Sequence, residues 1–128
     1  MCNFALEKIE EITGEIEFYK LINGDKCEFD EFWAKIEKTG NLKKQLNNLQ
    51  TTMQAVSENQ SLPDTKFKDI TPKKVADKEY EIKTKNLRLY LFHEKHTGRV
   101  IVCGGKKTTQ KKDIKRFQRI KKQYFEEK

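Results

Sequence analysis

The sequence predicts an α+β fold: a small twisted antiparallel sheet with an N-terminal two-helix hairpin packed on it and a short basic C-terminal helix. Alternating or continuously apolar runs between residues 80 and 103 are typical of neighbouring strands. Apolar residues at helical spacing in 28–58 and in 111–125 predict the helices. A chain of 128 residues suits one domain with a modest core, so we expect a single domain over 1–128.

The first expected element is a β-hairpin whose two strands cover residues 4–10 and 15–22. The second run alternates, with Phe18 pointing to one face and Tyr19 to the other. Thr13-Gly14 separates the two runs as a turn. The first run also fits the period of a short helix, and the sequence leaves both readings open.

Two helices are expected next, over residues 28–39 and 42–58, with Gly40 ending the first and Asn41 capping the second. Their apolar stripes are Phe29, Phe32, Trp33 and Ile36 in the first helix, and Leu42, Leu46, Leu49, Met53 and Val56 in the second. Because so short a connection forces an antiparallel hairpin, both stripes should face the sheet. We therefore interpret the aromatic residues as core and not as a ligand site.

Residues 57–76 are polar and contain both prolines, so they are expected to form a linker. The sheet should follow, with strands at 80–84, 87–92 and 99–103. Gly98 lies in the short polar loop of the second hairpin, as hairpin loops require. After the last strand, two glycines and two lysines are expected to release the chain into a positively charged loop.

A last helix is expected from about residue 111 to 125, capped by Thr108 or Thr109. Its apolar side contains Ile114, Phe117, Ile120 and Tyr124. The other positions are dominated by Lys111, Lys112, Lys115, Arg116, Arg119, Lys121 and Lys122. A helix with so little opposing acid is best explained by a polyanion or an acidic protein partner.

The charge is distributed unevenly along the chain. Residues 1–65 contain 7 Lys and Arg against 12 Asp and Glu, a net charge of −5, whereas residues 66–128 contain 20 against 8, a net charge of +12. Together they give the overall charge of +7. A basic half of this size indicates a partner with a phosphate backbone, so 66–128 is the expected functional half.

Several other classes of protein are not indicated. No apolar run reaches the roughly 18 residues of a membrane span, and the first residues do not resemble a signal peptide. Cys2, Cys27 and Cys103 are widely spaced and form no metal-binding motif, which predicts free thiols in the cytoplasm. The sequence contains no GxxxxGK[ST], GxSxG or HExxH motif.

Three stretches resemble the RelE/HigB superfamily of type II toxin-antitoxin toxins. They are YEIK at 80–83, LRLYLF at 87–92 and IVCGGKKTTQK at 101–111, followed by a helix at 113–124. The order of strand, two-helix hairpin, three-stranded sheet, basic loop and helix is also similar. The likeness covers residues 60–128 in motif and 1–58 in architecture alone.

The resemblance implies a ribosome-dependent mRNA endoribonuclease that cuts mRNA in the 30S A site, needs no metal or cofactor, and is neutralised by a cognate antitoxin. It implies that Lys83 is a base or phosphate contact, Arg88 a phosphate clamp and Lys107 the cation that stabilises the transition state. RNA would be held by Lys85, Lys106, Lys111, Lys112, Lys115, Arg116 and Arg119. The site would include no metal.

The general acid is the part of the implied site that has no clear residue. Family members often place a Tyr or His shortly after the basic loop, and here that region is Lys111-Lys112-Asp113-Ile114. The remaining candidates for an acid or base are His93, His96 and Tyr124, although a histidine in a hairpin loop is more often simply solvated.

Two other functions remain open. One is a ParE-like toxin that binds a topoisomerase without cutting nucleic acid, and the other is a small basic RNA-binding protein. The set of Lys83, Arg88 and Lys107 favours the nuclease, because a toxin that binds a protein has no need of clustered phosphate contacts.

Overall fold

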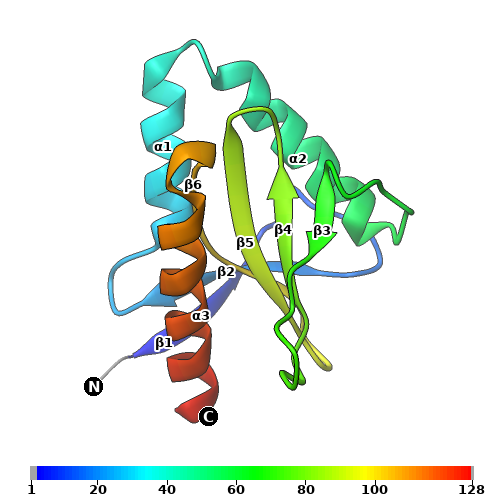
Figure 1. Cartoon of the computed structure of the whole chain (residues 1–128), viewed down its shortest axis with the longest axis vertical. Helices are drawn as coiled ribbons and strands as arrows, with labels where there is room; N and C mark the ends of the chain where they lie inside the picture. Colours follow the sequence, from blue (N-terminus) through cyan, green and yellow to red (C-terminus); the bar gives the residue numbers. More distant parts are fainter. Residues whose placement is uncertain (1–2, 128) are drawn as a thin grey trace.

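A computed structural model describes residues 3–127 and shows one mixed β-sheet with helices on both of its faces (Figure 1). The six strands lie in the order β1-β2-β6-β5-β4-β3. The strands are β1 (Phe4–Lys8), β2 (Phe18–Asn23), β3 (Phe67–Asp69), β4 (Glu79–Lys83), β5 (Leu87–Glu94) and β6 (Gly98–Lys106). The α-helices are α1 (Glu28–Thr39), α2 (Lys43–Ser57) and α3 (Gln110–Glu126), with a 3-10 turn at Lys107–Thr109.

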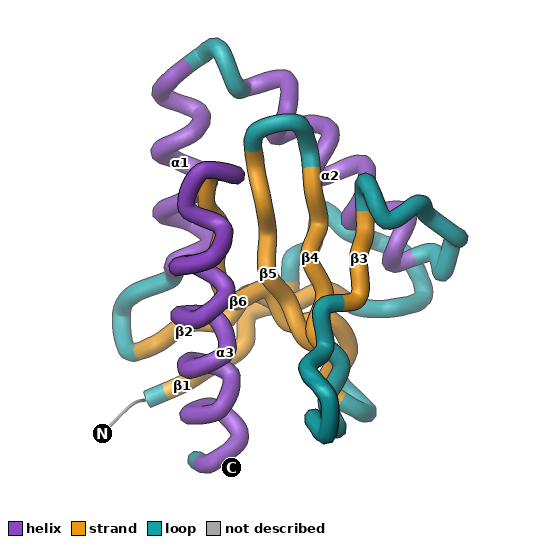
Figure 2. Tube along the Cα trace, viewed as in Figure 1, coloured by secondary structure: helices purple, strands orange, loops and turns teal. Residues whose placement is uncertain are grey.

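Helices α1 and α2 cover one face of the sheet and enclose its apolar core. They meet at the turn around Gly40 and spread apart from it across the sheet (Figure 2). The predicted stripes point inward, since Phe29, Phe32, Ile36, Leu46, Leu49, Met53 and Val56 are all buried. Leu87, Leu89, Leu91 and Ile101 meet them from the sheet. Trp33 is half-buried at the margin of this core.

Helix α3 packs on the opposite face. Phe117, Ile120 and Tyr124 are buried against Tyr90, Phe92, Val100 and Val102 of the central strands. Strand β5 serves both cores because its side chains alternate between the two faces. Every residue of β5 is therefore buried except His93, which is intermediate.

The predicted sheet and helix order need three corrections. The sheet is larger than predicted and is not wholly antiparallel, since β2 pairs with β6 in parallel. The helical pair follows two strands and is therefore not N-terminal in order. The C-terminal helix is not short, because α3 has 17 residues and is the longest of the helices described.

Local corrections concern the ends of elements. The first run is a strand, and β2 begins at Phe18, later than predicted, because residues 9–17 form a loop. The predicted linker 57–76 contains β3, which pairs with β4. Asn41 does not cap α2, since Leu42 holds the N-cap position and makes no side-chain cap bond. The predicted end of α1 at Gly40 is confirmed, with φ 72°.

The two glycines predicted to release the chain are instead inside β6. A Cβ on Gly104 would lie 2.7 Å from the ring of Phe32 in α1, and one on Gly105 would lie 2.0 Å from Oδ2 of Asp113 in α3. Helices therefore approach β6 closely from both faces at adjacent positions. Glycine is needed here for close packing.

None of the helices described is long and apolar enough to cross a bilayer. Cys27 and Cys103 are free thiols, and Cys103 is fully buried. Burial raises the pKa of Cys103 to about 12. Cys2 lies outside the described residues.

Candidate functional site

The predicted cationic residues meet at one end of the sheet. Lys83 ends β4 and lies opposite Arg88 in β5, which in turn lies opposite Gly105 in β6. Lys107 begins the turn after β6, and its backbone N–H donates to the carbonyl of Asn86, at a distance of 2.8 Å. Residues far apart in sequence are thus brought to the same end of three neighbouring strands.

These cations differ in accessibility. Arg88 is only 6% exposed, and its Nη1 donates to the carbonyl oxygens of Thr84 and Leu87, at 2.6 and 2.9 Å. Its Nε is buried without a hydrogen-bond partner among the described residues. Lys83 is half-buried. The exposed cations at this end include Lys85, Lys106 and Lys107. Arg88 is therefore anchored by the backbone, and the lysines form the outer surface.

A buried polar cluster lies next to Arg88 on the face that α3 covers. Glu81 and Tyr90 are directly opposite each other in β4 and β5, and they are 1% and 0% exposed. Glu81 accepts a hydrogen bond from Nε2 of Gln110, in the first turn of α3. The hydroxyl of Tyr90 is buried and has no hydrogen-bond partner within residues 3–127.

Tyr90 keeps its proton in this environment. Burial raises the pKa of its phenol, and the negative charges of Glu81 and Asp113 raise that pKa further. The ring is stacked on Phe117, with 6.0 Å between the ring centroids. The Tyr90 side chain is therefore buried, neutral and stacked on Phe117, two residues from Arg88 in the same strand.

Asp113 organises the start of α3, where its carboxylate lies close to Gly105 of β6. It is 5% exposed, and its Oδ2 accepts a hydrogen bond from Oγ1 of Thr109, at 2.6 Å. Its Oδ1 pairs with Nη1 of Arg116, at 3.2 Å, and Nε of Arg116 pairs with Glu28, at 3.1 Å. Arg116 was predicted to bind RNA, but two carboxylates already hold its guanidinium.

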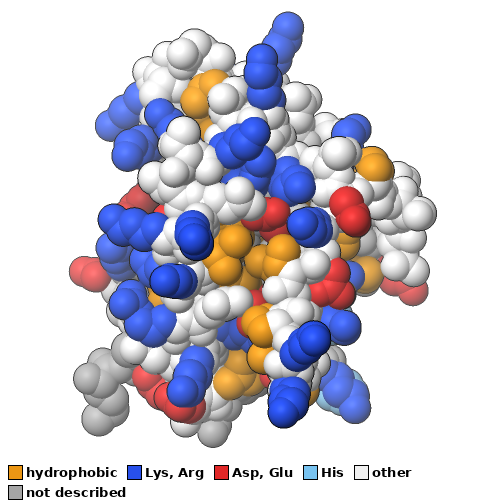
Figure 3. All heavy atoms as spheres, viewed as in Figure 1, with side chains coloured by type: hydrophobic (Ala, Val, Ile, Leu, Met, Phe, Trp, Pro, Cys, Tyr) orange, Lys and Arg blue, Asp and Glu red, His pale blue; other side chains and the backbone are white. Residues whose placement is uncertain are grey.

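Helix α3 carries a hollow of about 730 Å³ whose described lining is wholly cationic: Lys111, Lys112, Lys115, Arg116 and Arg119. Apart from Arg116, these side chains are exposed. Figure 3 shows Lys and Arg side chains following α3 and continuing across the upper part of the same face. This surface has the charge and the breadth that a phosphate backbone requires.

The structure does not bring the other predicted acid or base candidates, His93, His96 and Tyr124, to this site. His93 lies five residues beyond Arg88 in β5, which is about 17 Å along an extended strand. His96 is exposed in the turn after β5. Tyr124, near the other end of α3, donates to both carboxylate oxygens of Glu94, each at 3.0 Å. These three residues therefore cannot serve a reaction at Arg88 without a large rearrangement.

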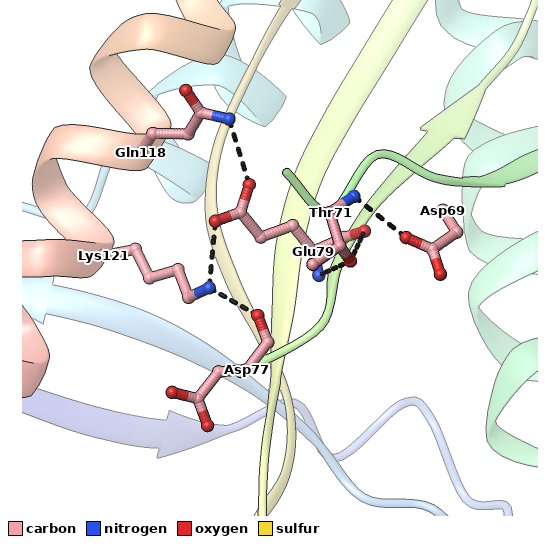
Figure 4. A network of polar contacts seen from close by, with 6 residues as sticks. All are labelled: Asp69, Thr71, Asp77, Glu79, Gln118 and Lys121. Atoms are coloured by element: carbon pink, nitrogen blue, oxygen red, sulfur yellow. Dashed lines mark hydrogen bonds and ion pairs between the residues drawn. The ribbon is translucent and has the colours of Figure 1, made fainter. Parts of the chain in front are cut away.

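A second polar network docks the middle of α3 on β4 (Figure 4). The Nζ of Lys121 lies 2.9 Å from Oε2 of Glu79 and also donates to the carbonyl of Asp77. Gln118 donates to the other carboxylate oxygen of Glu79, at 3.1 Å. The side chains of Glu79 and Lys121 are 4% and 6% exposed. Lys121 is thus a docking residue and not part of the basic surface.

Reasoning from sequence missed Glu81, Tyr90, Gln110 and Asp113 as members of the site. One signal was present, because Arg88 and Tyr90 are two residues apart in a strand and must share a face. The contribution of α3 had no such signal, since Gln110 reaches Glu81 across 29 residues of sequence.

Comparisons with protein-family models, with curated proteins and with solved structures give no match to this chain. Within residues 3–127, no group of three or more His, Cys, Asp and Glu side chains is arranged to hold a metal ion.

Proposed function

We propose that this protein is a metal-independent endoribonuclease that acts on mRNA in the manner of the RelE/HigB toxins. The observation that carries the proposal is the meeting of Lys83, Arg88 and Lys107 at one end of the sheet, beside the cationic hollow of α3. The succession of β4, β5, β6, the Lys107–Thr109 turn and α3 is compatible with the resemblance that the motifs of residues 80–124 carry, whereas β1 and β3 are not part of that resemblance.

The chemistry assigns a role to each group. A base takes the proton of the RNA 2′-hydroxyl, whose oxygen attacks the adjacent phosphorus while the bond to the 5′-oxygen breaks. The products are a 2′,3′-cyclic phosphate and a 5′-hydroxyl. Lys107 and Arg88 would stabilise the charge that develops on the phosphate, and Lys83 would act as base or phosphate contact.

Tyr90 is our candidate for the group that protonates the leaving 5′-oxygen. It is neutral and close to Arg88, whereas His93, His96 and Tyr124 lie toward the other end of β5 or α3. Because Tyr90 is fully buried, it can reach RNA only when the first turn of α3 moves away. Separation of Gln110 from Glu81 would accompany that movement.

The proposal extends to partners. The substrate would be mRNA in the ribosomal A site, the setting in the cytoplasm, and the inhibitor a cognate antitoxin. A phosphate-rich partner suits the exposed lysines of α3 and of the adjoining turn.

Primer extension on a reporter mRNA in a purified translation system tests the activity. We expect cleavage inside ribosome-bound codons by the wild type, at least about 100-fold less with Lys107→Ala, and a similar loss with Tyr90→Phe. Lys35→Ala removes an exposed lysine from α1, on the other face, and is the matched control. Circular dichroism verifies that each variant is folded.

Three results would count against the proposal in different ways. If the mRNA stays intact but the protein still binds RNA, the protein would be an RNA-binding protein without nuclease activity. Intact mRNA without RNA binding would favour the topoisomerase-binding class. Cleavage that Lys107→Ala does not reduce would place the chemistry elsewhere.

The salt dependence of RNA binding tests the role of the exposed lysines of α3. Each phosphate contact to single-stranded RNA contributes about 0.7 to the slope of log affinity against log salt. Replacing Lys111, Lys112 and Lys115 by alanine should therefore lower that slope by about 2 in a binding titration. Lys35→Ala should leave the slope unchanged, and equal slopes for all proteins would exclude α3 as the RNA surface.

A further inference from the structure

A groove lies on the face opposite to α3, between the two helices and the loop that follows β1. Its main hollow has a volume of about 500 Å³. A neighbouring hollow of about 530 Å³ shares Glu11, Ile12 and Gln50 with it and extends along α2 to Glu58. The two hollows therefore form one elongated groove, which suits a length of polypeptide better than a compact ligand.

The loop wall of the groove is fixed to α2. The backbone N–H of Ile16 donates to the carbonyl of Ser57, at 2.8 Å, and that of Thr13 donates to Oε1 of Gln54, at 3.0 Å. A Cβ on Gly14 would lie 2.2 Å from Oγ of Ser57, so the loop approaches the helix closely. The groove is thus formed in advance of any binding.

The floor of the groove is apolar. It contains Ile9, Ile12, Phe29, Trp33, Ala34 and Met53. Trp33 is half-buried and lies beside Phe29, with 5.5 Å between the ring centroids. Aromatic and aliphatic side chains in a preformed hollow are typical anchor points for apolar side chains of a partner.

The rim is acidic. The lining includes five carboxylates and two lysines, a formal charge of −3. Lys20 is already paired with Glu7 and Asp30, at 3.3 and 3.0 Å. The other three carboxylates, Glu10, Glu11 and Glu37, form no ion pair with any residue of the described part of the chain.

We propose that this groove binds a cationic amphipathic segment of a partner protein. Apolar side chains of the segment would cover Trp33 and Ala34, and its Lys or Arg residues would pair with Glu10 and Glu11. An acidic segment or RNA would meet the wrong charge here, while both suit the opposite face. The molecule would then hold a basic protein segment on one face and leave α3 for a polyanion.

Trp33 is the single tryptophan of the chain, so its fluorescence reports directly on the groove. The probe is a synthetic peptide of lysine and leucine, spaced so that the leucines form one helical face. The control peptide has glutamate in place of lysine. We expect a saturable change in Trp33 emission with the lysine peptide, weaker binding at higher salt, and no change with the glutamate peptide.

Two variants locate the binding. Glu10→Gln with Glu11→Gln should weaken it about tenfold, whereas Glu126→Gln with Glu127→Gln, the same charge change at the end of α3, should leave it unaltered. Ala34→Arg should block the groove, and because Ala34 is exposed on α1 this variant should fold. Circular dichroism verifies folding.

The absence of any saturable change would overturn the proposal. Equal binding of both peptides would do the same, because it would indicate nonspecific apolar contact. The proposal would also be wrong if an RNA oligonucleotide changed Trp33 emission and the Glu10→Gln, Glu11→Gln variant abolished that change. The groove would then bind a different class of partner.

Discussion

The two faces of the sheet are built differently. The face under α1 and α2 buries aliphatic and aromatic side chains, and none of the described charged residues is buried in its core. The face under α3 buries every charged residue found below the surface in the described chain. These are Glu79, Glu81, Arg88, Glu94, Asp113 and Lys121. One face is an ordinary hydrophobic core, and the other is a polar interface with an apolar centre.

The difference shows that α3 depends on specific partners in a way that α1 and α2 do not. Apolar packing is non-directional, so a core of leucines tolerates small shifts. A buried charge is stable only where its partner lies, and moving α3 would separate Lys121 from Glu79 and Gln110 from Glu81. The Lys121–Glu79 pair therefore fixes the middle of the helix that carries the basic surface. The first turn, which has to open for Tyr90 to reach RNA, is joined to the sheet by the hydrogen bond of Gln110 to Glu81.

Removing one charge at this interface should have the largest effect on stability. Lys121→Ala leaves Glu79 buried without its cation, and we expect the free energy of unfolding to fall by about 3–5 kcal/mol in chemical denaturation. Replacing both residues, Glu79→Leu with Lys121→Met, should recover most of this loss. Lys122→Ala, at the exposed neighbouring position, is the control and should hardly change the free energy of unfolding. A loss for Lys121→Ala as small as that for Lys122→Ala would contradict the difference between the two faces.

A cavity on the other face should cost somewhat less. Leu49 is fully buried under α2, and Leu49→Ala should lower the free energy of unfolding by about 3 kcal/mol. No charge is involved, so the loss should be the same at low and high salt. Gln50→Ala is the exposed control. A salt-dependent loss for Leu49→Ala would indicate that the two faces are not as distinct as we argue.

The smallest expected effect is the pH dependence of stability that comes from His93. Alternation along β5 places this residue on the face that α1 and α2 cover. Burial lowers the pKa of His93, and the positive charge of Arg99 lowers it further. The neutral imidazole is therefore favoured in the folded protein. Stability from this residue is present above its unfolded pKa, about 6.5, and is lost as pH falls through the lower folded pKa.

Because His93 is partly exposed, we expect the loss to remain below about 1 kcal/mol. Melting temperatures between about pH 7.5 and pH 5 should fall less for His93→Gln than for the wild type. His96→Asn, in the exposed turn, is the matched control. A steeper fall for His93→Gln would mean that this histidine gains a proton on folding.

Elements with a strong local pattern were predictable. The stripes of α1 and α2 and the alternation in β4, β5 and β6 reflect burial on defined faces, and the structure confirms them. Strand β3 was missed because three residues are too few to show a hydrophobic periodicity. It is held by pairing with β4 and by the stacking of Phe67 on Tyr80, with 4.7 Å between the ring centroids. The parallel pairing of β2 with β6 is equally non-local.

The site was predictable only in part. The strand positions of Lys83 and Arg88 follow from alternation, and the structure places them side by side. The burial of Arg88, Glu81 and Tyr90 depends on α3, whose docking residue Lys121 has the same side chain as its exposed neighbour Lys122 and differs from it only in its helical spacing from Phe117 and Tyr124. For the same reason, Arg116 gave no sign that Glu28 and Asp113 would bind it.

The central place of β6 also determines when the chain can fold during synthesis. This strand separates β2 from β5, although about 75 residues of sequence lie between the end of β2 and its start. Until residues 98–106 have left the ribosome, the first hairpin and the first two helices lack the strand that joins them to the rest of the sheet. The emerging chain therefore has to remain without its final structure for most of its translation, with apolar stripes that a chaperone would recognise.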